Sequence, residues 1–268
     1  MASSAATRSG PVYTVQLDIK GCSFDVRVND GLALKSLKGL PLVTELPVNR
    51  WIRNGGNELS LHLRPSPNQT ALGPEAKCSA VVYTRDQAEE REARREVARR
   101  EFPKSPATRR EGDETIVVSP FPAAVPFGLF RWFTAPEIAD NENTLAELMA
   151  ELQKYHGLFA AKNMNALLEA VRERDREDAM ANYLPLADQV ANSRREYSLF
   201  FDESKYELRP LITKNVRLGL YGNRRLARVE LLSNGQPPLY YLAADHRTAG
   251  YLQMMFCRGA EGKWVIIR

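Results

Sequence analysis

The chain has 268 residues, which at ~150 residues per domain is enough for two domains that each bury a hydrophobic core. Its composition, 44% hydrophobic and 26% charged, is that of an ordinary globular protein and excludes collagen, a coiled coil and wholesale disorder. The formal net charge of +4, from 37 basic and 33 acidic residues, is too small a surplus to indicate a nucleic-acid partner.

The first residues, MASSAATRSGP, lack the apolar segment of a signal peptide, and no later run approaches the ~18 apolar residues that span a bilayer. We therefore expect no membrane partner and a cytoplasmic protein, or a periplasmic one if a leader peptide has been removed. Cys22, Cys78 and Cys257 follow no disulfide or metal-binding spacing. We expect buried, reduced thiols, with a Cys22–Cys78 bridge left open as an alternative.

Alternating apolar residues in the first half of the chain predict antiparallel strands. Residues 13–28 contain two alternating runs on either side of Lys20-Gly21, and we expect them to pair as a hairpin. Residues 59–63 predict a strand with one buried face, and residues 76–85 and 114–120 supply further strands. Together they predict an antiparallel β-sandwich.

The charged segment near residues 86–102 is predicted to be a helical insertion in this domain. Glu90 and Arg94, like Glu96 and Arg100, stand four residues apart and form favourable pairs on a helix. Acidic and basic residues almost balance here, so we interpret the segment as a solvated helix and not as a nucleic-acid-binding arm.

Asn49, Trp51, Gly55, Asn57 and Leu59 form the pattern N-x-W-I-x-x-G-x-N-x-L. This pattern resembles that of jelly-roll β-sandwich domains, including those attached to carbohydrate enzymes. Glycine permits positive φ in the loop, and the Asn57 amide can satisfy backbone groups left unpaired there. We interpret Trp51 as a core residue. The alternative is a carbohydrate-binding module, which requires an exposed Trp51.

The segment 121–138 is rich in aromatic residues and proline, a composition that forms neither an ordinary helix nor a central strand. We place the domain junction here, with a β-sandwich domain over residues 1–135 and a second domain over residues 136–268. Four aromatic residues either join the two domains or, if exposed, anchor a partner protein: Phe127, Phe130, Trp132 and Phe133.

Helical periodicity replaces alternation after the junction. Thr144 and Glu147 predict a capping box at the start of a long helix, and a second helix begins near Asn163. Pro185 separates a charged segment from a short helix around 186–195.

After Pro210 the pattern becomes that of strands. Glycine-containing pairs at Gly222-Asn223, Asn234-Gly235 and Glu261-Gly262 predict the hairpin turns of an antiparallel meander. Helices followed by such a meander predict an α+β fold class, with the sheet curled around the long helix.

The helix pair LAELMAELQKYHGLFAAKNMNALLEAV and the closing strand GKWVIIR resemble the nuclear transport factor 2-like superfamily of cone-shaped α+β proteins. The resemblance covers residues 144–268. It implies a small-molecule pocket between helix and sheet, in which the enzymes of the superfamily use an Asp or a His. It also implies that aromatic residues on the open part of the sheet, here Tyr240 and Tyr251, bind a partner or form a homodimer.

The sequence contains no GxSxG, HExxH, P-loop or GxGxxG motif, and we expect no catalytic residue, cofactor or metal. His62, on the polar face of its strand, is expected in solvent, and His156 is expected as a satisfied core histidine. Asp245-His246 is the only pair to consider as an acid/base unit. Because adjacent residues of a strand point to opposite faces, a turn is the simpler interpretation.

We therefore expect a non-catalytic protein-binding protein. Sandwich and cone modules without catalytic motifs look similar to the cognate immunity proteins of bacterial type VI secretion. That resemblance implies a cognate toxin as partner, neutralised by direct binding, and the charge disfavours DNA mimicry. The alternative is a small-molecule-binding or enzymatic protein that uses a pocket in the C-terminal domain, with Asp245 or His246 as the acid/base group.

Overall fold

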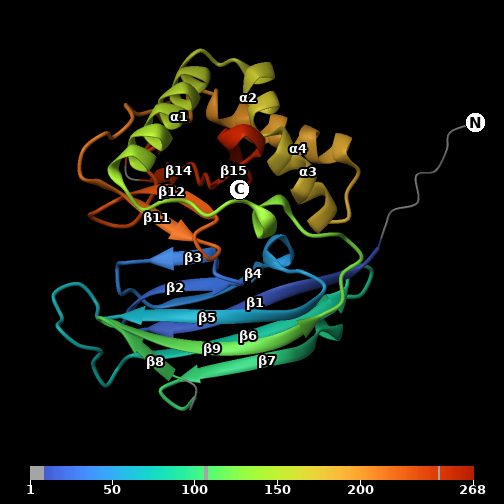
Figure 1. Ribbon diagram of the computed structural model, residues 1–268, viewed down its shortest axis with the longest axis vertical. Coiled ribbons are helices and arrows are strands. Elements are labelled where there is room, and N and C mark those ends of the chain that lie inside the picture. The colour runs from blue at the N-terminus through green and yellow to red at the C-terminus, as the bar shows by residue number, and fades with distance from the viewer. Residues whose placement is uncertain (1–8, 106–107, 247) are drawn as a thin grey trace, which may run out of the picture. The chain divides into compact units, whose positions relative to one another are not determined.

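The computed structural model describes residues 9–105, 108–246 and 248–268 (Figure 1). This part of the chain is an α+β protein with four α-helices and sixteen strands in four antiparallel sheets. Its internal contacts divide it into two compact units. Unit 1 runs to Phe130 and also includes Ala181–Tyr183, and unit 2 comprises Arg131–Met180 and Leu184–Arg268. The first crossing between them falls within the aromatic segment 121–138.

Unit 1 contains two antiparallel sheets. The four-stranded sheet has the order β4 (Leu42–Pro47), β1 (Pro11–Lys20), β6 (Lys77–Asp86), β7 (Arg95–Phe102). The five-stranded sheet has the order β3 (Gly31–Ser36), β2 (Ser23–Val28), β5 (Gly55–Arg64), β9 (Glu114–Ala123), β8 (Thr108–Glu111). Each sheet has a fully buried apolar row, formed on β1 by Val15, Leu17 and Ile19 and on β5 by Leu59, Leu61 and Leu63. The expectation of a β-rich N-terminal half is confirmed.

The predicted hairpin over residues 13–28 is wrong. β1 pairs with β4 and β6, whereas β2 pairs with β3 and β5 in the other sheet. At Gly21 (φ +68°) the chain leaves the first sheet, and a Cβ at this position would lie 2.9 Å from the carbonyl oxygen of Glu75. Only glycine fits this passage without strain. Alternation identified the buried face of each strand correctly, but it does not specify which strand is the partner.

The predicted charged helix near 86–102 is also wrong. A short 3-10 turn, η2 (Arg91–Ala93), leads into β7, which pairs antiparallel with β6. The charges that suggested a helix are satisfied on the strand: Arg99 bonds to Glu96, and Arg100 donates through Nε to the carbonyl oxygen of Val118, at 2.8 Å. Pairing with a neighbouring strand therefore outweighs the local helical preference.

The Asn49–Leu59 pattern performs the structural role that the sequence predicts. Asn57 Oδ1 accepts from the backbone N–H of Arg53 (3.0 Å), and Asn57 Nδ2 donates to the carbonyl oxygens of Arg53 (2.9 Å) and Gly55 (3.0 Å). Gly55 has a φ of +94°. Trp51, in η1 (Asn49–Trp51), is buried against Gly31. The carbohydrate-binding alternative required an exposed Trp51 and is wrong.

Unit 2 contains the helices and two smaller sheets. The helices are α1 (Glu142–Ala160), α2 (Met164–Ala170), α3 (Arg172–Ala181) and α4 (Leu186–Phe200), with 3-10 turns at η3 (Arg131–Thr134) and η4 (Ala260–Gly262). One sheet has the order β10 (Tyr206–Leu208), β13 (Tyr240–Ala243), β14 (Ala249–Tyr251). The other has the order β11 (Val216–Tyr221), β12 (Leu226–Leu231), β15 (Phe256–Arg258), β16 (Trp264–Ile266).

The predicted meander is therefore divided between two sheets. Gly222-Asn223 and Glu261-Gly262 do form hairpin turns, between β11 and β12 and between β15 and β16. Asn234-Gly235 instead connects β12 to β13, which belong to different sheets. The residues of α1 that face these sheets, including Leu148, Leu152 and Phe159, form the core of unit 2.

The start of α1 differs from the predicted capping box. Asn141 is the N-cap, and its Oδ1 accepts from the backbone N–H of Thr144, at 2.9 Å. Glu147 does not reach back to the helix start but accepts from Trp264 Nε1, at 3.1 Å. The start of α2 is as predicted, because Asn163 Oδ1 accepts from the backbone N–H of Ala166.

Replacing Asn57 by alanine tests the role of the loop amide. Loss of these buried hydrogen bonds, each contributing ~1 kcal/mol, should lower the free energy of opening of β2 and β5 by about 2 kcal/mol, measured by hydrogen exchange. The control is Gln69→Ala, an exposed side chain in the loop after β5. Equal protection in the two variants would contradict the role assigned to Asn57.

Candidate functional site

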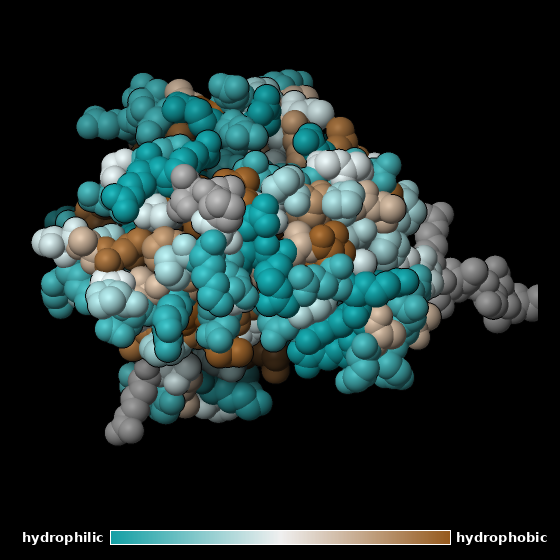
Figure 2. Space-filling view, turned by 90° about the horizontal axis from the view of Figure 1, so that it is seen from below, coloured by the Kyte–Doolittle hydropathy of each residue, from teal (hydrophilic) through white to brown (hydrophobic). Residues whose placement is uncertain are grey.

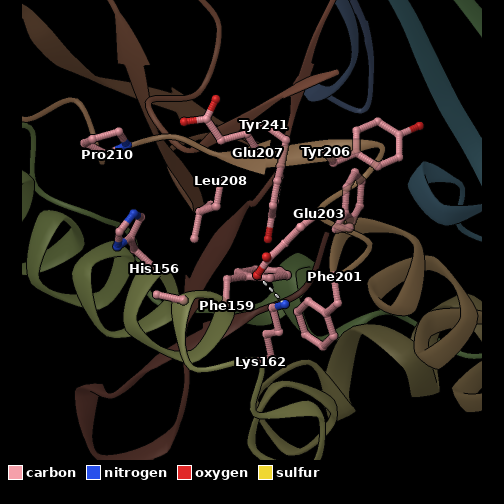
Figure 3. Close-up of a pocket in the computed structure, with 12 residues that line it drawn as sticks. His156, Phe159, Lys162, Phe201, Glu203, Tyr206, Glu207, Leu208, Pro210 and Tyr241 are labelled. Atoms are coloured by element: carbon pink, nitrogen blue, oxygen red, sulfur yellow. Dashed lines mark hydrogen bonds and ion pairs between the residues drawn. The ribbon is translucent and has the colours of Figure 1, made fainter. Parts of the chain in front are cut away.

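A pocket of about 470 Å³ lies within unit 2, in the size range of small-molecule sites (Figure 3). Its walls come from the C-terminal ends of α1 and α4, from the loop after α4, and from β10 and β13. The lining residues are His156, Phe159, Ala160, Lys162, Phe200, Phe201, Glu203, Tyr206, Glu207, Leu208, Pro210 and Tyr241.

Local backbone geometry brings the helix ends to this place. α1 ends at Ala160, and Lys162 adopts a positive φ of 50°, which turns the chain sharply into the N-cap of α2 at Asn163. α4 ends at Phe200, and the following residues fold into a turn in which the backbone N–H of Tyr206 donates to the carbonyl oxygen of Asp202. The pocket is thus framed by two helix C-termini and a short strand.

Aromatic side chains form the inner wall. The rings of Phe200 and Tyr241 stack with centroids 4.8 Å apart and an interplanar angle of 18°. Phe159 meets Tyr241 edge-on at 5.9 Å, and Tyr206 meets Phe200 in the same manner at 5.6 Å. Such mutually packed rings offer a rigid apolar surface on which a planar molecule can lie.

The hydroxyl of Tyr241 lies in this wall without a hydrogen-bond partner among the described residues. The residue is 1% exposed, and burial, with the neighbouring Tyr197, raises the pKa of its phenol well above the ordinary value. The group is therefore a neutral O–H that can donate and accept. The hydroxyl oxygen itself is closed off from water, so a ligand reaches it only when the surrounding rings part. Leaving such a group unpaired costs ~1–3 kcal/mol.

Charged residues occupy the outer part of the pocket. Lys162 Nζ donates to Glu203 Oε1 at 2.5 Å, and this hydrogen bond and the charge of Lys162 lower the pKa of Glu203. Glu207 accepts from Arg209 at 2.7 Å. His156 Nε2 lies 3.1 Å from the carbonyl oxygen of Arg209. His156 is thus satisfied by the backbone, as predicted, although it is half-buried and contributes to the pocket wall.

The aromatic residues of the junction lie elsewhere. Phe130 and Trp132 are buried, whereas Phe127 and Phe133 are half-buried. In unit 1 Phe127 packs between Phe130, at 5.1 Å, and Tyr183, at 6.1 Å, and in unit 2 Trp132 stacks on Phe133 at 3.8 Å. In this conformation Phe130 and Trp132 fill cores and present no exposed anchor.

The tyrosines predicted to bind a partner form a pair across two strands. Tyr240 and Tyr251 are half-buried, directly opposite each other on β13 and β14, with ring centroids 5.7 Å apart. Neither lines the pocket. Since Tyr240 precedes Tyr241 on the same strand, its side chain points to the opposite face of the sheet. Binding of a partner by these residues stays a prediction.

The acid/base pair considered from sequence is not in the pocket. Asp245 and His246 are exposed in the turn between β13 and β14, where His246 has a φ of 51° and Asp245 accepts from the backbone N–H and the hydroxyl of Thr248. Asp245 and His246 are therefore not the acid/base group of this pocket, and their simpler interpretation as a turn is confirmed.

His62 was expected in solvent, but it is buried in a polar network on the outer face of the five-stranded sheet. Its Nδ1 lies 2.8 Å from Glu114 Oε2, and its Nε2 lies 3.3 Å from Ser60 Oγ. Serine, histidine and carboxylate stand in the order of an acyl-transfer triad. Ser60 is buried, however, and its strand is paired on both sides, so no backbone N–H there is free to stabilise an oxyanion. We assign the network a structural role.

Asp25 is the centre of that network. It is fully buried, and Arg64 (3.0 Å), Arg27 (3.0 Å) and Lys35 (3.7 Å) surround its carboxylate. Burial by itself raises the pKa of Asp25, but the hydrogen bond from Arg64 and the three positive charges outweigh burial and hold the pKa well below its ordinary value. Burial likewise raises the pKa of Glu114, but the hydrogen bond with His62 and the charge of Arg64 outweigh it and lower the pKa to about 2.

Within the described ranges, no group of three or more His, Cys, Asp or Glu residues is arranged to hold a metal ion. In the same part of the chain, no helix is long and apolar enough to cross a membrane. All three cysteines are free and buried. Comparison of the chain with protein-family models, with curated proteins and with solved structures found no match.

The resemblance implied a pocket in this half of the chain, but sequence reasoning missed the residues that line it. Lys162, Glu203 and Tyr241 stand far apart along the chain, and none belongs to a motif. The one usable clue was Asn163, whose capping role places a sharp turn, and hence Lys162, at the end of α1.

Replacing Asp25 by asparagine tests the charged network. Because the native pKa is lower than the unfolded value of ~3.9, the stabilisation is fully present above that value and is lost as the pH falls toward the native pKa. Breaking a buried pair should lower the free energy of unfolding by about 3 kcal/mol at pH 7, with a difference that shrinks below pH ~4. Urea unfolding at several pH values measures this.

The matched control is Asp18→Asn, at an exposed carboxylate on β1 of the same unit. It should leave stability almost unchanged. An Asp25→Asn variant as stable as this control at pH 7 would show that the buried charge contributes nothing.

Proposed function

We propose that this protein is a binding protein whose unit 2 holds a small planar aromatic molecule against Tyr241. The observation that carries the proposal is the unpaired hydroxyl of a 1% exposed tyrosine that lines a pocket of about 470 Å³. A ligand that hydrogen-bonds to this oxygen removes the cost of leaving it unpaired.

The surrounding rings determine the shape of the ligand. Phe159, Phe200 and Tyr206 provide flat ring surface, and polar side chains make up the rest of the wall together with a few aliphatic ones. Rings combined with placed polar groups are the usual lining of small-molecule sites. The position of the pocket, between helix ends and a sheet, supports the alternative function predicted from the nuclear transport factor 2-like resemblance. That superfamily assignment, like the jelly-roll class of unit 1, remains part of the proposal.

Neutralisation of a cognate type VI secreted toxin by direct binding is the second candidate function. The observation that favours a protein partner is β4, an edge strand on which Val43 is 73% exposed, with Leu40 exposed just before it. Edge strands with apolar side chains accept an added strand. Figure 2 shows hydrophobic residues scattered among hydrophilic ones on the face in view. A homodimer through the same edge is the related possibility.

A Val43→Lys substitution tests the homodimer through β4. Sedimentation equilibrium should show the same mass for both proteins if the wild type is monomeric, and a loss of dimer in the variant if β4 joins two copies. A dimer unaffected by the substitution would contradict a homodimer through β4.

Binding of p-cresol tests the aromatic pocket, because it has one ring and one hydroxyl. For so small a ligand we expect a Kd on the order of 1 mM by NMR titration. Tyr241→Phe removes only the hydroxyl. It should weaken the binding of p-cresol by about fivefold, or ~1 kcal/mol, and leave the binding of toluene unchanged.

Tyr240→Phe is the matched control for this experiment, since it removes a hydroxyl from the neighbouring residue outside the pocket. It should leave both ligands unaffected. If p-cresol does not bind, or binds the Tyr241→Phe variant as well as the wild type, the proposed function is wrong.

A further inference from the structure

The outer part of the pocket carries one positive and one negative charge that neutralise each other. Lys162 and Glu203 both line the pocket, and they meet there as an ion pair at 2.5 Å. The other carboxylate of the lining, Glu207, is already paired with Arg209. To bind either Lys162 or Glu203, a charged ligand must therefore first separate the two residues.

This ion pair opens at little cost. The Lys162 side chain is 46% exposed and that of Glu203 is 79% exposed. Ion pairs as exposed as this one contribute ~0–1 kcal/mol. The two side chains come from different turns, one after α1 and one after α4, so they can part without disturbing a helix. A charged ligand can therefore separate them.

The charge of the ligand decides whether separation is favourable. A ligand with one charge forms one new ion pair and leaves the other residue without its partner, so the number of ion pairs does not change. A ligand with both an ammonium and a carboxylate breaks one ion pair and forms two. The pocket therefore favours a molecule that carries both charges close together at one end.

The opposite end of the ligand must suit the buried wall. Tyr241 is 1% exposed, so its hydroxyl lies at the inner end, with the Phe200 and Phe159 rings against it. A ring fits this place, and a polar substituent on the ring reaches the unpaired hydroxyl. The ligand therefore carries an ammonium and a carboxylate at its exposed end and an aromatic ring at its buried end.

We infer that the ligand is a free aromatic α-amino acid with a polar ring substituent, of which tyrosine is the simplest example. Its ammonium group binds Glu203, its carboxylate binds Lys162, and its ring substituent bonds to Tyr241. This inference rests on the proposed function, because it names the ligand of the same pocket.

Four ligands that share one ring separate the contributions in an NMR titration at ~20 mM salt. L-tyrosine has both charges, tyramine only the ammonium, 3-(4-hydroxyphenyl)propionate only the carboxylate, and p-cresol neither. L-tyrosine should bind about fivefold more tightly than p-cresol, and the two singly charged compounds no more tightly than p-cresol. The advantage of L-tyrosine should shrink at ~500 mM salt because the charges are exposed.

Two variants assign the advantage to the ion pair. In Lys162→Gln, Glu203 has lost its partner, so tyramine should bind about fivefold more tightly than it binds the wild type. In Glu203→Gln, Lys162 has lost its partner, so 3-(4-hydroxyphenyl)propionate should gain by the same factor. The control is Glu151→Gln on α1. It breaks the exposed ion pair between Glu151 and Lys154, and neither residue lines the pocket. It should leave both affinities unchanged.

The outcomes distinguish the two proposals. If p-cresol binds and L-tyrosine binds no more tightly, the inference about the amino acid is wrong and the aromatic pocket stands. The same holds if L-tyrosine binds more tightly but Lys162→Gln does not tighten the binding of tyramine and Glu203→Gln does not tighten that of 3-(4-hydroxyphenyl)propionate. If neither compound binds, both proposals are wrong.

Discussion

A polar group removed from water needs a hydrogen-bond partner, and this constraint governs both units of the protein. In unit 1, Asn49 accepts from the backbone N–H of Tyr13 and donates to the carbonyl oxygen of Pro11, and Asn57 bonds to the backbone on both sides of its loop. The buried carboxylate of Asp25 has three cations around it. The hydroxyl of Tyr241 departs from this rule, and it does so where the protein is hollow.

The buried hydroxyl of Ser119 in unit 1 also lacks a partner among the described residues, but only that of Tyr241 belongs to a residue of the pocket wall, which makes it a candidate binding group. Phe159 and Phe200 would pack equally well around a phenylalanine, so the hydroxyl of Tyr241 adds nothing to the stability of the empty pocket. At the outer end, by contrast, Lys162 and Glu203 are satisfied by each other and by water. The pocket thus has an unpaired hydroxyl at its inner end, which costs free energy, and an ion pair at its outer end, which opens at little cost. A ligand bonds to the hydroxyl of Tyr241 and replaces Lys162 and Glu203 as each other's partner.

Alternation and helical periodicity could predict which residues are buried, but not which elements meet. The buried faces of β1 and β5 and the ranges of α1 and α2 followed from the sequence, because each depends on neighbours a few residues away. The hairpin over residues 13–28 and the helix near 86–102 were wrong for one reason. In both cases pairing with another strand decided the outcome: β5, far along the chain, for the first, and the preceding strand β6 for the second.

The same limit explains why the candidate site escaped prediction. Asp245-His246 drew attention because the two residues are adjacent, yet they form a turn. Lys162, Glu203 and Tyr241 come together only when two helices end beside β13, and no local pattern encodes that meeting. His62 was misplaced in a similar way, since its partner Glu114 lies on another strand.

The most direct test of the central claim is to locate a bound aromatic ring by intermolecular nuclear Overhauser effects in the wild-type protein. With p-cresol near saturation, the account predicts cross-peaks from its ring protons to the ring protons of Tyr241, Phe200 and Phe159. Cross-peaks confined to residues outside this pocket would contradict it.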